Sequence, residues 1–228
     1  GDLSANKFIV WYAYRRFPQL ECPLGVKVVA RLRINYGARQ SFSKIADDLG
    51  FWPFISASEE DRSRKKKDLL EDCLEAFIGC VEQILDKEYR PGVGYGIVFD
   101  MLSAIFDDIP MSLHYNDLYD AKTRIKELFD VYKDLGTWTF IDIREELLAT
   151  SNIYQVPPGI SKQPRKEITG PGHRDFICHP HPEWIHLGKG VAAKKADAQQ
   201  KAADYGLKNL NRKGWVREVP EEYKRFVQ

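Results

Sequence analysis

The sequence predicts a mainly helical protein, in which an all-helical domain precedes a smaller domain of mixed helix and strand. Apolar residues recur at helical spacing through the first half of the chain, whereas strand-like segments occur only after about residue 150. The length of 228 residues suits one or two domains, each with a real core.

Six helices are expected in the first part of the chain. In each of them, apolar residues return every three or four positions and so form one buried face. The expected helices cover residues 2–16, 24–35, 41–48, 61–87, 95–107 and 120–134.

Asp72 and Glu75 are the most informative residues of the helical part. They lie three positions apart in the helix expected over 61–87, so both carboxylates leave one face and could share a hydrated divalent cation. Gly79 costs about 1 kcal/mol relative to alanine inside a helix, which suggests close approach of another backbone. Because acidic pairs are also common on solvated helix faces, this pair needs support from elsewhere in the chain.

That support is a resemblance to the ribonuclease III family. The stretch Asp72-x-x-Glu75-Ala-Phe-Ile-Gly79 is similar to the family's second acidic signature, and Gly1-Asp2-Leu3 is similar to the end of its first. The resemblance implies a helical endonuclease domain over residues 1–115, in which Asp2, Asp72 and Glu75 hold catalytic magnesium, or manganese in its place. Such ions activate water and stabilise charge on the phosphate during hydrolysis.

The family's fourth acidic ligand is a Glu four residues before Asp2, which would precede residue 1. The family's opening helices would precede it too. Residues 1–228 alone are therefore expected to cleave poorly or not at all.

A Gly-rich turn followed by an Ala-rich helix marks the end of the chain. Small or apolar residues recur at positions 198, 202, 203, 207 and 210, which predicts one buried stripe. Lys194 and Lys195 lie at the start of this helix, where lysines, backbone amides and the helix dipole together suit a phosphate.

This segment resembles the last helix of a double-stranded-RNA-binding domain, although the lysine pair is displaced by one position from the family pattern. Gly170-Pro-Gly-His173 is similar to that domain's loop between its first two strands, and Asp120 to Phe129 is similar to its first helix. The resemblance implies an α-β-β-β-α domain over residues 118–214 that binds double-stranded RNA largely by shape. The implied RNA-binding residues are Lys122, Arg124, His173, Lys189, Lys194 and Lys195.

The strands of this domain are expected at residues 165–169, 174–178 and 184–187. A long insertion would then occupy residues 134–166, and its middle, Thr139 to Thr150, looks like an extra helix. Residues 215–228 would form a C-terminal extension.

Charge divides the chain in the same way. From Ser161 onward, 14 Lys and Arg stand against 8 Asp and Glu, a net charge of +6, while the preceding residues hold 20 and 25, a net of −5. A basic rear half is typical of nucleic-acid binding, and an acidic front half suits cation binding. A solvated basic surface without a partner is the alternative interpretation.

The resemblance to the ribonuclease III family implies a magnesium-dependent endoribonuclease that cleaves double-stranded RNA to products with 5′-phosphates and 3′-hydroxyls, acting as a homodimer through its helical domain. The alternative is a catalytically inactive relative that binds double-stranded RNA as a structural subunit, for example in a mitochondrial ribosome. The Glu that would precede residue 1, the displaced lysines and the long insertion keep this alternative open.

The chain carries no sign of a membrane span or of paired cysteines. No apolar run approaches the length of a spanning helix, and the four cysteines show no disulfide-like spacing. An intracellular location is therefore expected, in the cytoplasm or else in the nucleus or a mitochondrion.

Overall fold

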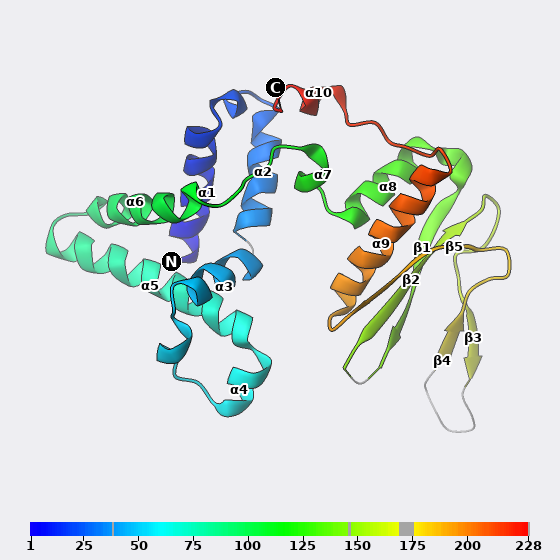
Figure 1. The fold of residues 1–228 in the computed structure, drawn as a ribbon, viewed down its shortest axis with the longest axis horizontal. Coiled ribbons are helices and arrows are strands. Elements are labelled where there is room, and N and C mark those ends of the chain that lie inside the picture. The colour runs from blue at the N-terminus through cyan, green and yellow to red at the C-terminus, as the bar shows by residue number, and fades with distance from the viewer. Residues whose placement is uncertain (38, 146, 169–175, 228) are drawn as a thin grey trace. The chain divides into compact units, whose positions relative to one another are not determined.

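The computed structural model describes residues 1–37, 39–145, 147–168 and 176–227, which form two compact units (Figure 1). Unit 1 contains Gly1–His114 and Glu221–Gln228, and unit 2 contains Tyr115–Pro220. The last residues of the chain thus return to the helical unit instead of forming a separate extension over 215–228.

Unit 1 is helical and has one aromatic-rich core. Buried residues of α1, α3, α5 and α6 form this core, in which the ring of Phe8 stacks on Tyr12 and meets the edge of Phe106. The elements of unit 1 are α1 (Asp2–Arg16), η1 (Pro18–Leu20), α2 (Gly25–Tyr36), α3 (Arg39–Asp48), η2 (Trp52–Phe54), α4 (Glu59–Arg64), α5 (Lys66–Glu88), α6 (Val93–Asp107) and α10 (Glu221–Lys224). No helix in the described ranges is long and apolar enough to cross a membrane.

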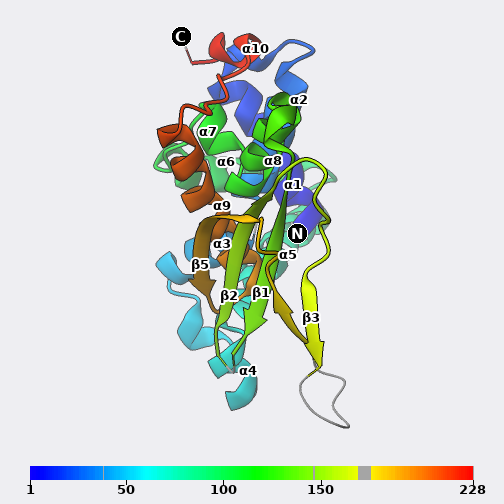
Figure 2. The same ribbon diagram turned by 90° about the vertical axis from the view of Figure 1, so that its right-hand side faces the viewer.

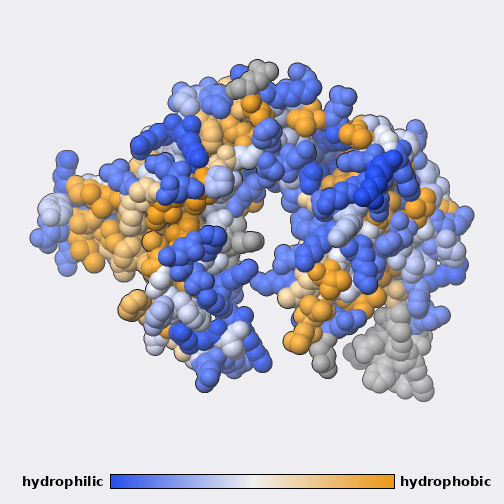
Figure 3. All heavy atoms as spheres, in the orientation of Figure 1, coloured by the Kyte–Doolittle hydropathy of each residue, from blue (hydrophilic) through white to orange (hydrophobic). Residues whose placement is uncertain are grey.

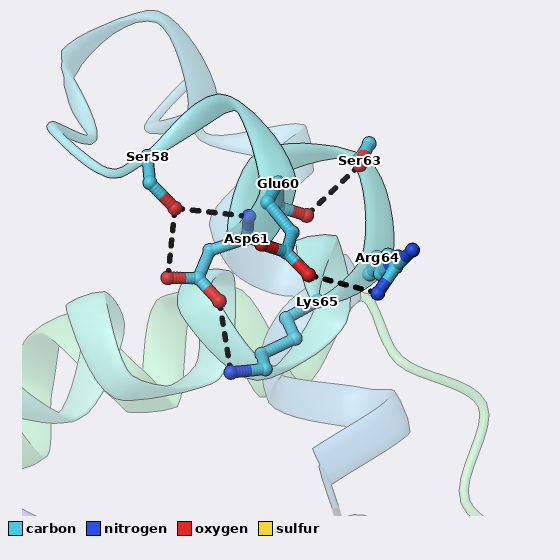
Figure 4. A network of polar contacts seen from close by, with 6 residues as sticks. All are labelled: Ser58, Glu60, Asp61, Ser63, Arg64 and Lys65. Atoms are coloured by element: carbon cyan, nitrogen blue, oxygen red, sulfur yellow. Dashed lines mark hydrogen bonds and ion pairs between the residues drawn. The ribbon is translucent and has the colours of Figure 1, made fainter.

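The helix expected over 61–87 is interrupted at Lys65, where α4 ends and α5 follows. Ser58 caps α4, since its hydroxyl accepts the Asp61 amide at 3.1 Å. Two ion pairs at i,i+4 spacing, Asp61 with Lys65 and Glu60 with Arg64, each at 2.8 Å, complete this short helix (Figure 4). Because these pairs are exposed to solvent, they add little to stability, so the cap and the pairs define the helix ends more than they stabilise the unit.

The C-terminal helix α10 packs into unit 1 through Tyr223 and Phe226, both of which are buried. The side-chain amide of Gln19 donates to the carbonyl of Phe226 at 3.4 Å. Unit 1 is therefore built from both ends of the chain.

Replacing Phe226 with alanine is expected to lower the free energy of unfolding of unit 1 by about 3–5 kcal/mol, because the ring is 1% exposed and its removal leaves a cavity. Urea denaturation of the full chain measures the effect. Val227→Ala is the control, since this neighbouring side chain is exposed. Equal costs for the two substitutions would contradict the packing of α10 on unit 1.

Unit 2 combines helices with a three-stranded antiparallel sheet of order β1-β2-β5 and a separate hairpin of β3 and β4 (Figures 1 and 2). Its elements are α7 (Tyr115–Leu118), α8 (Ala121–Val131), η3 (Lys133–Leu135), β1 (Thr137–Arg144), β2 (Ala149–Val156), β3 (Arg165–Ile168), β4 (Phe176–His179), β5 (Ile185–Ala192) and α9 (Lys195–Arg212).

One secondary-structure prediction for unit 2 was wrong. The segment 139–150, expected to be a helix, forms most of β1 and the start of β2. The strands expected at 165–169 and 174–178 occur as β3 and β4 within the described residues, but they form a hairpin separate from the three-stranded sheet, to which residues 137–156 contribute β1 and β2. Residues 144–149 are rich in helix-forming residue types. The residues on either side of them nevertheless pair between β1 and β2, and Ile153 packs under the helices. Burial in the folded unit therefore overrides the local preference for a helix.

Helices α8 and α9 pack on one face of the three-stranded sheet. The predicted small-residue stripe of α9 is buried there, as Ala198, Ala202 and Ala203 are inaccessible. Gly190 permits this close approach, because a Cβ at that position would lie 2.1 Å from the carbonyl oxygen of Ala198. On the opposite face, Trp184 packs with Ile141 and Val156.

Candidate functional site

Helix α5 presents three different faces. At 3.6 residues per turn, Leu70, Leu74 and Ile78 point into the core of unit 1. One flank of this core face is acidic and the other is apolar and largely exposed. The acidic flank holds Asp68, Glu71, Asp72, Glu75, Glu82 and Asp86, and the apolar flank holds Cys73, Phe77, Cys80 and Ile84.

The start of the chain lies directly against the acidic flank. A Cβ on Gly1 would be 1.6 Å from the carbonyl oxygen of Glu75, and a Cβ on Gly79 would be 2.8 Å from the Gly1 nitrogen. The close backbone approach predicted from Gly79 is therefore confirmed. It brings the first residue of α1, Asp2, beside Glu75.

Glu75 lies in a concentration of negative charge. Its pKa is raised above the ordinary value, first by burial and then by the nearby carboxylates of Asp2, Glu71 and Asp72. The structure thus gathers carboxylates of α1 and α5 at one place and surrounds Glu75 with like charge.

Hydrogen bonds and a cleft further define this acidic cluster of Asp2, Glu71, Asp72 and Glu75. The Asn6 side chain donates to the Asp2 carboxylate at 2.7 Å and fixes its direction. A cleft of about 600 Å³ adjoins the cluster and is lined by Asp2, Glu82 and Asp86 among others. The mouth of this cleft is therefore acidic.

The cluster suits a hard divalent cation by its charge and its oxygen donors. Magnesium keeps several water ligands and commonly takes only one or two protein carboxylates. Within the described part of the chain, however, no group of three or more His, Cys, Asp or Glu is already arranged to hold a metal ion. The residues present would thus bind a water-rich ion and do not form a complete protein cage.

In unit 2 the structure brings two of the predicted RNA-binding residues together. The Lys122 ammonium donates to the Gln199 side chain at 2.8 Å, and Lys195 lies 2.9 Å from Asp142, which also accepts a hydrogen bond from Gln199 at 2.9 Å. Lys194 occupies the N-cap position of α9 without a side-chain capping hydrogen bond. Its side chain is exposed and forms no ion pair among the described residues.

Arg124 and Lys189 lie elsewhere in unit 2. Arg124 turns toward Asp204 in the middle of α9, with 3.9 Å between Nη2 and Oδ1. Lys189 stands between two glycines that face α9, so its side chain leaves the opposite face of the sheet. His173 lies outside the described residues. Between β1 and β2, the Glu145 amide donates to the carbonyl of Leu148 at 2.9 Å.

Sequence reasoning missed Glu71 and Asp142. Glu71 precedes Glu75 by four positions, and helical spacing alone could have placed it on the same face. Asp142 could not have been found this way, since its segment was assigned to a helix.

Comparison with known proteins gives a consistent set of relatives. The chain is 36% identical to "Putative ribonuclease 3" of Invertebrate iridescent virus 6, over an alignment that covers all of this chain and 75% of the relative. It is 38% identical to the protein of the same name from Frog virus 3, covering 97% of this chain but 53% of the relative, so it spans about half of that protein.

A bacterial relative is more distant. "Ribonuclease 3" of Lactococcus lactis subsp. cremoris is 25% identical, over 92% of this chain and 78% of the relative. Among solved structures, Dicer from Pichia stipitis aligns with 96% of the chain at 19% identity and a TM-score of 0.29. No family model matches the chain.

Proposed function

Because this chain belongs to the ribonuclease III family, we propose that it acts as an endoribonuclease on double-stranded RNA and leaves 5′-phosphates and 3′-hydroxyls. The observation that carries the proposal is the acidic cluster at the contact of α1 and α5, in which Glu75 is surrounded by like charge. Clustered carboxylates destabilise the fold unless a cation neutralises them, so their gathering indicates a cation-binding role.

We propose that Asp2, Asp72 and Glu75 bind magnesium, for which manganese can substitute. A bound ion of this kind would supply an activated water and stabilise charge on the phosphate. Asn6 holds the Asp2 carboxylate in place, and the contact between Gly1 and Gly79 sets the spacing of α1 from α5. No protein nucleophile is required.

We propose that unit 2 is a double-stranded-RNA-binding domain. Support comes from the element order, since α8, β1, β2, β5 and α9 follow the α-β-β-β-α pattern once the β3–β4 hairpin is treated as an insertion. The exposed Lys194 at the start of α9 and Lys122 of α8 are the proposed contacts to the RNA backbone. Contacts of this kind read duplex shape rather than sequence.

The exposed apolar flank of α5 supports a homodimer of the helical unit. Phe77, Cys80 and Ile84 are exposed at helical spacing, and Ile97 of α6 is exposed as well. Figure 3 shows hydrophobic side chains gathered over α5 and α6. We propose that a second copy of the chain covers this surface, which would place two acidic clusters on one duplex.

A noncatalytic RNA-binding subunit is the competing function, and one observation favours it. Within the described residues no ready-made group of metal ligands is present. The deciding experiment is cleavage of an end-labelled RNA duplex with magnesium and with chelator, beside a single-stranded control and a binding assay. Magnesium-dependent cutting of the duplex alone supports the nuclease, whereas binding without cutting by a protein that includes the preceding Glu supports the subunit.

Replacing Gly79 with alanine is expected to reduce cleavage about tenfold or more without lowering thermal stability. The new Cβ would meet the Gly1 nitrogen at 2.8 Å and push Asp2 away from Glu75, while alanine favours the helix by about 1 kcal/mol. Gly96→Ala in α6 is the matched control, because nothing lies within 4 Å of its Cβ position. Equal activity of the two variants would show that the α1–α5 contact does not position the site.

A further inference from the structure

Asp142 of β1 lies over the first turn of α9 and is held by three donors. Its carboxylate pairs with Lys195 at 2.9 Å, accepts the Gln199 side-chain amide at 2.9 Å and accepts the Ser151 hydroxyl at 2.5 Å. Ser151 faces it directly across the β1–β2 ladder. The position of this carboxylate is therefore set by both the sheet and the helix.

The same contacts connect Asp142 to α8. Gln199 donates to Asp142 with its nitrogen and accepts from Lys122 with its oxygen, so its amide group can serve both partners only in this orientation. Lys122, Gln199, Asp142 and Lys195 thus form one continuous polar chain from α8 to α9, referred to below as the Asp142 network.

This network changes the charge at the start of α9. The side chain of Asp142 is 21% exposed and that of Lys195 is 65% exposed, so the carboxylate is the fixed partner and the lysine is the accessible one. A phosphate that approached Lys195 would also experience the negative charge of Asp142, 2.9 Å from the ammonium group. Lys194, the preceding residue, has no such counter-ion among the described residues.

We infer that Asp142 is an internal counter-ion that withdraws Lys195 from RNA binding and leaves Lys194 as the phosphate contact at this end of α9. The inference rests on the proposed function of unit 2 and goes beyond it, because it assigns different roles to two adjacent lysines. Asp142 acts through Lys195 and keeps the affinity for duplex below what the two lysines together would provide.

The test compares four variants of the full chain in duplex binding over a range of salt concentrations, with chelator present to prevent cleavage. The variants are Lys194→Gln, Lys195→Gln, Asp142→Asn and the double variant Asp142→Asn with Lys195→Gln. Asparagine keeps the shape of Asp142, and its oxygen can accept from Gln199 while its nitrogen donates to the Ser151 hydroxyl, so the network can persist without the negative charge.

Lys194→Gln is expected to weaken binding and to reduce the slope of log affinity against log salt by about one. Lys195→Gln is expected to lose less affinity than Lys194→Gln and to leave the slope unchanged, because it removes no phosphate contact and only leaves the charge of Asp142 uncompensated. Asp142→Asn is expected to strengthen binding about threefold to tenfold and to steepen the slope by about one, because Lys195 becomes available. This gain should vanish in the double variant, which makes the coupling of the two residues measurable.

Three outcomes would overturn the inference. If the unchanged chain binds no duplex, the proposed function of unit 2 fails and the inference fails with it. If the unchanged chain binds but Lys195→Gln loses as much affinity as Lys194→Gln, the inference alone fails. The inference also fails, and the proposed function of unit 2 still stands, if Asp142→Asn gains no affinity for duplex although its melting temperature is unchanged.

Discussion

Replacing Glu75 with glutamine is expected to reduce duplex cleavage by at least about a thousandfold while duplex binding stays within about twofold. Glutamine keeps the size of the side chain but removes one anionic ligand of a water-rich cation site, and stabilisation by such an ion amounts to several kcal/mol in the transition state. Single-turnover cleavage of a labelled duplex and a binding assay with chelator measure the two effects separately.

Glu71→Gln is the matched control for this substitution. Glu71 lies one turn earlier on the same flank of α5 and contributes to the same field at Glu75, but it is not a proposed ligand. Its replacement is expected to change cleavage by less than about tenfold. Similar losses for both variants would mean that total charge matters and that Glu75 has no special role.

Thermal stability gives a readout of the Glu75 site that does not depend on activity. In chelator, Glu75→Gln is expected to raise the melting temperature, since it removes a carboxylate that burial and its neighbours Asp2 and Asp72 disfavour. Magnesium should stabilise the unchanged chain by binding only its folded state, and the variant much less. Equal stabilisation of both by magnesium would place the ion elsewhere.

Replacing Ile84 with aspartate is expected to convert a homodimer into monomers. The side chain is 66% exposed on the apolar flank of α5, so the substitution does not disturb the core of unit 1, but it would place an unpaired charge in the proposed interface. Burial of such a charge weakens the free energy of dimer association by at least about 2 kcal/mol, which raises the dissociation constant of the dimer about thirtyfold or more. Sedimentation velocity over a concentration series measures the change.

Ile34→Asp is the control for the interface. Ile34 is 54% exposed, but it lies on α2 and not on the apolar flank of α5. The Ile34→Asp variant should keep the oligomeric state of the unchanged chain, whereas in Ile84→Asp the cleavage activity should fall in parallel with dimer formation. A chain that is already monomeric, or an Ile84→Asp variant that still dimerises, would refute the proposed interface.

Most helices of unit 1 could be predicted because the information is local. Residues 2–16 form α1 as expected, and the helices expected at 24–35, 41–48 and 95–107 occur with shifts of one or two residues. A repeating apolar face requires only neighbours within one or two turns, and this pattern survives in the folded unit. The interruption at Lys65 was missed because it depends on the cap and ion pairs of α4.

The sheet of unit 2 could not be predicted in the same way. The segment 139–150 was expected to be a helix, but Thr139–Arg144 and Ala149–Thr150 lie in strands because β1 and β2 pair and pack under α8 and α9. Because this segment was assigned to a helix, the role of Asp142 in the sheet was missed. The joint action of Asp2, Asp72 and Glu75 stays a prediction, although the structure does bring Asp2 and Asp72 near Glu75.

The sequence by itself thus determined the helical class of unit 1, the acidic face of α5 and the small-residue stripe of α9, since each follows from residue spacing along one element. Three features were decided only by the tertiary structure. Gly1 lies against Glu75 and Gly79, α10 packs as part of unit 1, and Asp142 forms an ion pair with Lys195. These contacts join residues far apart in the chain, and their free energy depends on burial and on charges that no single segment contains.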